Sequence, residues 1–160
     1  MIALTPLYIG IDPGKTGAVA FLRGSEGWGE IVDTGDGYAV AELIRSQLRE
    51  HASVHAAIEK VSAFPGQGVS SSFNFGASWG VARGVCAALQ IPVTLVTPQR
   101  WNKLAFQGRN KPSGKPERIA AVLQIARERW PRASLKRVKD GAIGEALFMA
   151  LVAQRDEGGI

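Results

Sequence analysis

Two short apolar runs near the N-terminus, joined by a turn, place the strongest constraint on the fold. Residues Leu7 to Ile11 and Ala18 to Leu22 have the composition of buried β-strands. Between them stands Pro13-Gly14-Lys15-Thr16-Gly17, which has the proline and glycines of a tight turn. The sequence therefore predicts a β-hairpin at the start of the domain.

Strands and helices alternate after this hairpin. We expect the following order: strand 30–34 after a glycine-rich stretch, helix 38–49, strand 54–59, loop 62–72, helix 73–89, strand 91–96, and helices 116–130 and 140–153. This order predicts an α/β fold, with a mixed five-stranded sheet that carries helices on its faces. The 160 residues are enough for one core, so we expect residues 1–160 to form a single domain.

The predicted helix 73–89 contains three glycines, Gly76, Gly80 and Gly84, which recur every four residues along one face. Glycine in a helix costs about 1 kcal/mol relative to alanine. The pattern therefore favours a face at which another backbone approaches closely.

Positive charge is concentrated in one segment of the chain. Residues 98–139 contain twelve Lys and Arg and two acids, so this segment carries +10 although the whole chain carries only +5. A polyanion partner suits such an asymmetry, because each neutralised phosphate releases condensed counterions. The alternative is an ordinary solvated basic face.

Several other kinds of site are excluded or disfavoured. The single cysteine, Cys86, allows neither a disulfide framework nor a cysteine zinc site. The stretch Gly10 to Thr16 has three residues where a phosphate-binding P-loop needs four, and it lies in a hairpin rather than before a helix. No signal peptide or membrane-spanning run is present, so we expect a cytoplasmic protein without a membrane partner.

Four acidic residues are the candidate catalytic residues. Asp12 and Glu59 each end an apolar strand, where an unpaired carboxylate is costly and a cation is the usual remedy. Asp140 and Glu145 lie at the start of the last predicted helix, which can present Glu145 to the same point. Carboxylates around Mg²⁺ form a site for phosphodiester hydrolysis. Three of these acids also have a structural alternative: Asp12 in the turn, Glu59 at the surface, and Asp140 as a helix cap.

Three segments carry a family resemblance when they are taken in order. The segments are Ile9-Gly10-Ile11-Asp12-Pro13-Gly14, Ile58-Glu59-Lys60-Val61, and Lys139-Asp140-Gly141 with Glu145-Ala146-Leu147. Together they resemble the RuvC family of Holliday-junction resolvases, and in particular its phage-type branch. The stretch from Phe64 to Ser71 and the run Val96-Thr97-Pro98 with Trp101 are also similar to that branch.

The resemblance implies an RNase H-like domain that acts as a homodimer and nicks opposing strands of a four-way DNA junction. It also implies Mg²⁺ at each site, two ions with Mn²⁺ as a substitute, held by Asp12, Glu59, Asp140 and Glu145. The family places its two C-terminal acids three or four residues apart, and Glu145 matches the second. Asp140 lies five residues before Glu145, so it either reaches the metal from the preceding loop or has another role. The expected location is the cytoplasm of a bacterium or a phage-infected cell.

The resemblance also indicates residues that contact DNA. Lys103 and Lys115 are similar to the basic residues of the family near the junction phosphates, and Lys111 competes for either role. Arg109 is a further candidate in the same basic segment. Phe64 is similar to the aromatic residue that stacks on an unpaired base.

Two other functions fit the same residues. The first is an RNase H-type nuclease for RNA–DNA hybrids, since the sheet and the acids would serve equally. The second is a branched-DNA-binding module that fails to assemble metal because of the unusual spacing between Asp140 and Glu145.

Overall fold

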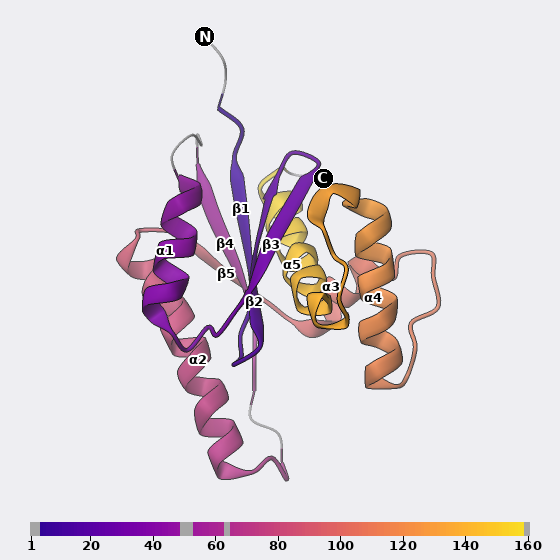
Figure 1. Ribbon diagram of the computed structural model, residues 1–160, viewed down its shortest axis with the longest axis horizontal. Helices are drawn as coiled ribbons and strands as arrows, with labels where there is room; N and C mark the ends of the chain where they lie inside the picture. Colours follow the sequence, from indigo (N-terminus) through magenta and orange to yellow (C-terminus); the bar gives the residue numbers. More distant parts are fainter. Residues whose placement is uncertain (1–3, 49–52, 63–64, 159–160) are drawn as a thin grey trace.

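The computed structural model describes residues 4–48, 53–62 and 65–158 and contains one mixed five-stranded sheet (Figure 1). The strands are β1 (Leu7–Asp12), β2 (Gly17–Arg23), β3 (Glu26–Val32), β4 (Val54–Glu59) and β5 (Val93–Val96). Their order across the sheet is β3-β2-β1-β4-β5. Strands β1, β2 and β3 pair antiparallel, whereas β4 is parallel to both β1 and β5. The predicted α/β architecture is confirmed.

Helices cover both faces of the sheet (Figure 1). One face carries α1 (Gly37–Gln47) and α2 (Val69–Ala88); the other carries α3 (Pro98–Ala105), α4 (Lys115–Arg129) and α5 (Gly141–Gly158). Two short 3₁₀ turns, η2 (Pro131–Ala133) and η3 (Val138–Asp140), connect α4 to α5. Among the residues described, no helix is long and apolar enough to cross a membrane.

The alternation of side chains along the strands decides which way the acids face. Ile9 and Ile11 of β1 belong to the core beneath α1 and α2, whereas Tyr8 belongs to the core beneath α5. Successive side chains of a strand point to opposite faces, so Asp12 shares the face of Tyr8. In β4, Ala57 lies in the α5 core and Ile58 in the opposite one, which puts Glu59 on the α5 face as well.

Gly10 allows α5 to lie directly on the central strand. A Cβ atom at this position would stand 1.7 Å from the carbonyl oxygen of Ala146 and 3.1 Å from the amide nitrogen of Ala150. No side chain fits between backbones that are so close. Gly10 therefore fixes the height of α5 over β1, and with it the position of Glu145 beside Ala146.

Most predicted elements are present; α5 runs to Gly158 rather than ending at residue 153, and the larger differences concern β3, α2 and α3. Strand β3 begins at Glu26 rather than at residue 30 and includes Gly27 and Gly29. A Cβ atom at Gly27 would stand 2.8 Å from the Trp130 ring, so this glycine is required by packing within a strand rather than by a loop. Helix α2 begins at Val69, inside the predicted loop 62–72. Helix α3 was not predicted.

The glycine face of α2 does not receive another part of this chain. Within the described ranges, a Cβ atom at Gly76, Gly80 or Gly84 would meet no atom within 4 Å. The expected close backbone approach is therefore absent inside the monomer, and this face of α2 is open.

Candidate active site

Asp12 ends β1 on the α5 face, where the chain turns toward β2. The turn is held by Thr34: its hydroxyl accepts a hydrogen bond from the Gly14 amide at 2.8 Å, and its own amide donates to the Gly14 carbonyl at 3.0 Å. Gly14 has φ +152°, which favours glycine. The Asp12 carboxylate has no hydrogen bond or ion pair with any residue the structure describes. The turn is thus fixed while its acid is left free.

Glu59 ends β4 and is held by two tryptophans from opposite faces of the sheet. Trp101 of α3, only 3% exposed, donates from Nε1 to the Glu59 Oε1 atom at 3.2 Å. Trp79 of α2 donates from Nε1 to the Glu59 backbone carbonyl at 2.9 Å. These bonds orient the carboxylate and leave its second oxygen without a partner in the described part of the chain.

Glu145 lies in α5 next to Ala146, the residue whose carbonyl contacts the Gly10 position. Like Asp12, Glu145 has no hydrogen bond or ion pair within the described ranges. Burial and, after it, the charge of Glu59 raise its pKa to about 7, although Arg118 and Lys115 oppose the shift. Glu145 is therefore close enough to Glu59 to be repelled by it.

The three acids form one electrostatic group. Burial, then the charges of Glu145 and Glu59, hold the pKa of Asp12 well above its usual range, and Lys115 acts in the opposite direction. The pKa of Glu59 is also raised by burial, against the hydrogen bond from Trp101. Partly buried carboxylates that repel one another and lack partners favour protonation or a bound cation.

The chemistry of the donor set fits Mg²⁺. Carboxylate oxygens are hard ligands, and Mg²⁺ usually keeps several waters and binds through only one or two carboxylates with substrate phosphate. Among residues 4–48, 53–62 and 65–158, no three His, Cys, Asp or Glu side chains stand close enough to enclose an ion by themselves. Water and a phosphate oxygen would have to complete a metal site at these three partly buried acids.

The structure does not bring Asp140 together with these three acids. Asp140 is 1% exposed, and its Oδ2 accepts from the amides of Lys136 at 2.9 Å and Arg137 at 2.7 Å. The Arg137 guanidinium donates to Oδ1 at 3.0 and 2.7 Å. Although burial alone would raise it, these bonds hold the pKa of Asp140 below its usual range. Asp140 therefore stabilises the turn before α5, which matches the capping alternative and differs from the predicted metal ligand.

The predicted DNA-contacting residues lie in different surroundings. Lys115 is the first residue of α4 and influences both Asp12 and Glu145 electrostatically. Lys103 and Lys111 line one cavity of about 500 Å³ on the α3 side. Arg109 forms an ion pair with Glu128 at 2.6 Å. Phe64 lies outside the described residues.

Sequence reasoning missed one basic residue near the acids and one contact of a residue that it had named. Arg118 stands three positions after Lys115 in α4, on the same helical face, and its charge acts on Glu145. That spacing is a signal that the sequence carries. The contact between Trp101 and Glu59 joins residues that are 42 positions apart, and no local pattern reveals it.

The strand order and the helices on both faces define an RNase H-like fold. Among solved structures, the chain is similar to RuvC of Thermus thermophilus. It matches RuvC in complex with a Holliday junction substrate with a TM-score of 0.64 and 19% identity, over 96% of each chain. It matches a second Thermus thermophilus RuvC structure with a TM-score of 0.61 and 21% identity, also over 96% of each chain. At this identity the similarity establishes the fold.

No protein-family profile matches the chain, and no curated protein does. The RuvC resemblance is thus confirmed at the level of structure, and the phage-type branch stays a prediction.

Proposed function

We propose that this protein is a metal-dependent endonuclease that resolves Holliday junctions and other branched DNA by paired nicking. The observation that carries the proposal is the group of Asp12, Glu59 and Glu145, three acids without ion-pair partners among the described residues, at the carboxyl end of the sheet. The same fold in RuvC has been solved with a Holliday junction substrate, which supports branched DNA as the substrate class here.

Each residue near the acids has a defined task in this proposal. Asp12, Glu59 and Glu145 hold Mg²⁺, two ions per site with Mn²⁺ as a substitute, and Trp101 orients Glu59 for this purpose. When bound, Mg²⁺ lowers the pKa of a water and stabilises charge on phosphate oxygens. Lys115 and Arg118 add positive charge at the same place, where it favours binding of the phosphate and stabilises the charge that develops on it.

The remaining predicted contacts would bind the DNA away from the scissile bond. Lys103 and Lys111 line one cavity and carry no ion pair within the part of the chain described, so both are available to phosphates. Arg109 would first have to release Glu128, which makes it a weaker candidate. Phe64 keeps the stacking role that the resemblance implies. Asp140 is left out of the metal-binding set, because both of its oxygens are already engaged.

Paired nicking requires two copies, and we place their contact on the open face of α2. This face carries Gly76, Gly80 and Gly84 with free space above them, and two exposed apolar residues near its start, Val69 (88% exposed) and Phe73 (73% exposed). Burial of such side chains favours association. Sedimentation should show a dimer, and Phe73→Glu should shift it toward monomer.

The decisive experiment removes one acid at a time. Asp12→Asn and Glu59→Gln should each reduce Mg²⁺-dependent cleavage of a synthetic four-way junction by on the order of 10³-fold, since several kcal/mol of transition-state stabilisation are lost. The matched control is Glu42→Gln, an acid on α1 on the other face of the sheet, which should cleave at the wild-type rate. Junction binding without Mg²⁺ should persist in all variants.

The same assay separates the alternatives. A wild-type protein that cuts an RNA–DNA hybrid faster than a junction of matched sequence would be an RNase H-type nuclease. A wild-type protein that binds the junction but cuts nothing with Mg²⁺ or Mn²⁺ would be a binding module.

A further inference from the structure

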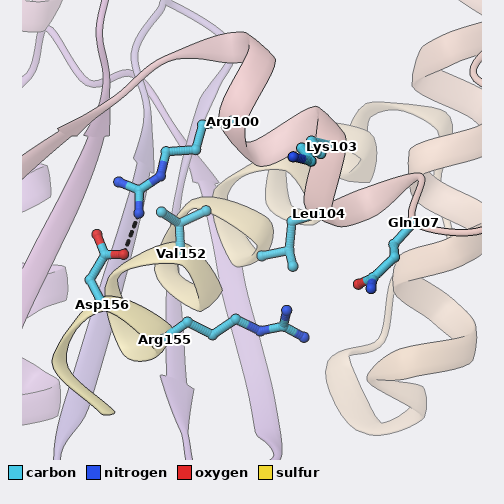
Figure 2. A pocket seen from close by; sticks show the side chains of 7 residues that line it. All are labelled: Arg100, Lys103, Leu104, Gln107, Val152, Arg155 and Asp156. Carbon is cyan, nitrogen blue, oxygen red and sulfur yellow. Dashed lines mark hydrogen bonds and ion pairs between the residues drawn. The ribbon is translucent and has the colours of Figure 1, made fainter. Parts of the chain in front are cut away.

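A basic cavity separate from the acids lies between α3 and the C-terminal half of α5 (Figure 2). Its volume is about 320 Å³, and its polar lining consists of Arg100, Lys103, Gln107, Arg155 and Asp156. It stands near the opposite end of α5 from Glu145. Arg155 lies ten positions after Glu145 in α5, which corresponds to about 15 Å along the helix axis.

The cavity holds more positive charge than Asp156, the one acid among the described residues that line it, can neutralise. Arg100 is paired with Asp156, as Figure 2 shows. Lys103 and Arg155 have no ion pair among the residues described. Figure 2 shows the Arg155 side chain running beneath Leu104 toward Gln107, away from that pair. Two cations are therefore left without a counter-charge in one hollow.

A third cation, Arg129, does not line this cavity but lies near Arg155. Burial lowers the pKa of Arg129 on α4, and the positive charge of Arg155 lowers it further, so the two guanidinium groups are close enough to repel each other. Neither has a carboxylate partner in the described chain. Like charges that a fold holds together without an acid are stabilised by an incoming anion.

The walls determine which anion fits. Leu104 and Val152 give the cavity an apolar side, which reduces the screening of the charges by water. A guanidinium presents a planar fork of donors that matches two phosphate oxygens, and lysine adds a point charge. A phosphodiester group, with a single charge and two free oxygens, suits this combination.

We propose that Arg155, with Lys103 and Arg129, binds backbone phosphates of a DNA arm at a second contact outside the catalytic site. The proposal rests on the proposed function for the identity of the polyanion. Double-stranded DNA carries one charge per strand for about every 3.4 Å of its axis. The distance of about 15 Å between Glu145 and Arg155 therefore corresponds to roughly four phosphates of one strand.

Two substitutions with opposite expected effects test the inference. Arg155→Gln should weaken binding of a labelled DNA duplex about threefold to tenfold and reduce the slope of log Kobs against log salt by about 0.9. Asp156→Asn removes the acid and releases Arg100, so it should tighten binding by about threefold. Fluorescence anisotropy over a series of salt concentrations measures both effects.

Matched controls lie on the opposite face of the sheet. Arg45 and Glu42 form an exposed ion pair on α1 at 3.5 Å, and Arg45→Gln and Glu42→Gln should leave affinity and salt slope unchanged. Equal melting temperatures of all variants exclude unfolding as the cause. If Arg45→Gln reduces the salt slope as much as Arg155→Gln does, the loss of any surface arginine has this effect, and the cavity has no special role.

The outcome also separates this inference from the nuclease proposal. Arg155→Gln should raise the junction concentration needed for half-maximal cleavage, whereas Arg45→Gln, which lies outside both sites, should cleave as wild type does. If Arg155→Gln and Asp156→Asn bind the duplex as wild type does and the wild type cleaves normally, the cavity does not bind DNA, and the nuclease proposal still stands. A weaker affinity for inorganic phosphate with an unaltered DNA slope would assign the cavity to a free anion and overturn the inference. If the two variants alter duplex binding but the wild type cleaves no junction, the cavity binds DNA and the nuclease proposal is wrong.

Discussion

The acids at the two ends of the sheet differ in whether they have hydrogen-bond partners. At the amino end, Glu157 of α5 accepts a hydrogen bond from the Tyr8 hydroxyl at 2.9 Å and contacts His55 Nδ1 at 2.8 Å. The other ring nitrogen of His55 lies 2.7 Å from the Thr94 hydroxyl. At the carboxyl end, Asp12 and Glu145 have no such partners within the described chain, although the same strand and the same helix supply them.

The contrast separates carboxylates that have hydrogen-bond partners inside the protein from carboxylates that do not. A carboxylate with its bonds satisfied inside the protein stabilises the fold by itself. Carboxylates that are held together without partners lower stability and need a ligand from outside. Asp140 and Glu145 repeat the contrast over only five residues, because Asp140 is fully hydrogen-bonded and Glu145 is not.

The largest expected effect separates the two ends by cleavage rate. Glu145→Gln should slow Mg²⁺-dependent junction cleavage by on the order of 10³-fold, because a charged oxygen ligand is replaced by a neutral amide. Glu157→Gln, the matched change at the other end of α5, should stay within about twofold of wild type. Single-turnover cleavage at saturating protein measures both, and equal losses in the two variants would erase the distinction between the ends.

Asp140→Asn should affect stability and leave the chemistry unchanged. An amide cannot accept the four hydrogen bonds that Asp140 receives, and Arg137 loses its partner, so the free energy of unfolding should fall by about 2 kcal/mol. Urea denaturation measures this loss. If the variant is folded and its cleavage falls as far as that of Glu145→Gln, Asp140 belongs to the catalytic group after all.

The acids should make metal-free stability depend on pH. Glu145 ionises near its ordinary pKa of 4.5 in the unfolded chain, whereas burial raises the pKa to about 7 in the folded protein. Between these values the folded state binds more protons, so the free energy of unfolding should decrease as pH rises from 4.5 to 7, by on the order of 1–2 kcal/mol.

Mg²⁺ should restore this stability at pH 8, and Glu145→Gln should flatten the profile. The measurement is urea denaturation in EDTA and in Mg²⁺ at several pH values. A metal-free protein that becomes steadily more stable from pH 5 to pH 8 would contradict the repulsion between the acids.

The smallest effect concerns the amino end alone. Glu157→Gln weakens the contacts with Tyr8 and His55, so the free energy of unfolding should fall by about 1 kcal/mol. Because no metal is expected there, the loss should be the same in EDTA and in Mg²⁺. A Mg²⁺-dependent difference would move the metal site or add a second one.

The sequence predicts those parts of the fold that depend on neighbours in the chain. The first hairpin and β4 are read directly, because apolar runs and turn residues mark them. The predicted start of strand β3 is too late in the chain, because Gly27 and Gly29 resemble a loop in the sequence. In the structure, Trp130 and Ile143 pack over these two glycines. Helix α3 is not predicted because it has only eight residues. Its start is nevertheless marked in the sequence by Thr97 and Pro98, and the Thr97 side chain accepts a hydrogen bond from the Arg100 amide.

The site divides in the same way. Asp12 and Glu59 follow from strand ends, and Glu145 follows from its place in the last helix and its motif. The bonds that remove Asp140 from this group arise from the fold of residues 136–140, which no periodicity describes. That the three acids bind metal stays a prediction.

Gly10 has a consequence for how this domain can change over evolution. Because the backbones of β1 and α5 touch there, α5 cannot slide or rise without losing this contact. The separation between Asp12 and Glu145 therefore depends on the absence of a Cβ atom at residue 10, a position that no substrate needs to reach. A larger side chain at residue 10 would displace α5, and with it Glu145, from inside the core, and a comparison of surface residues between relatives would not reveal the cause.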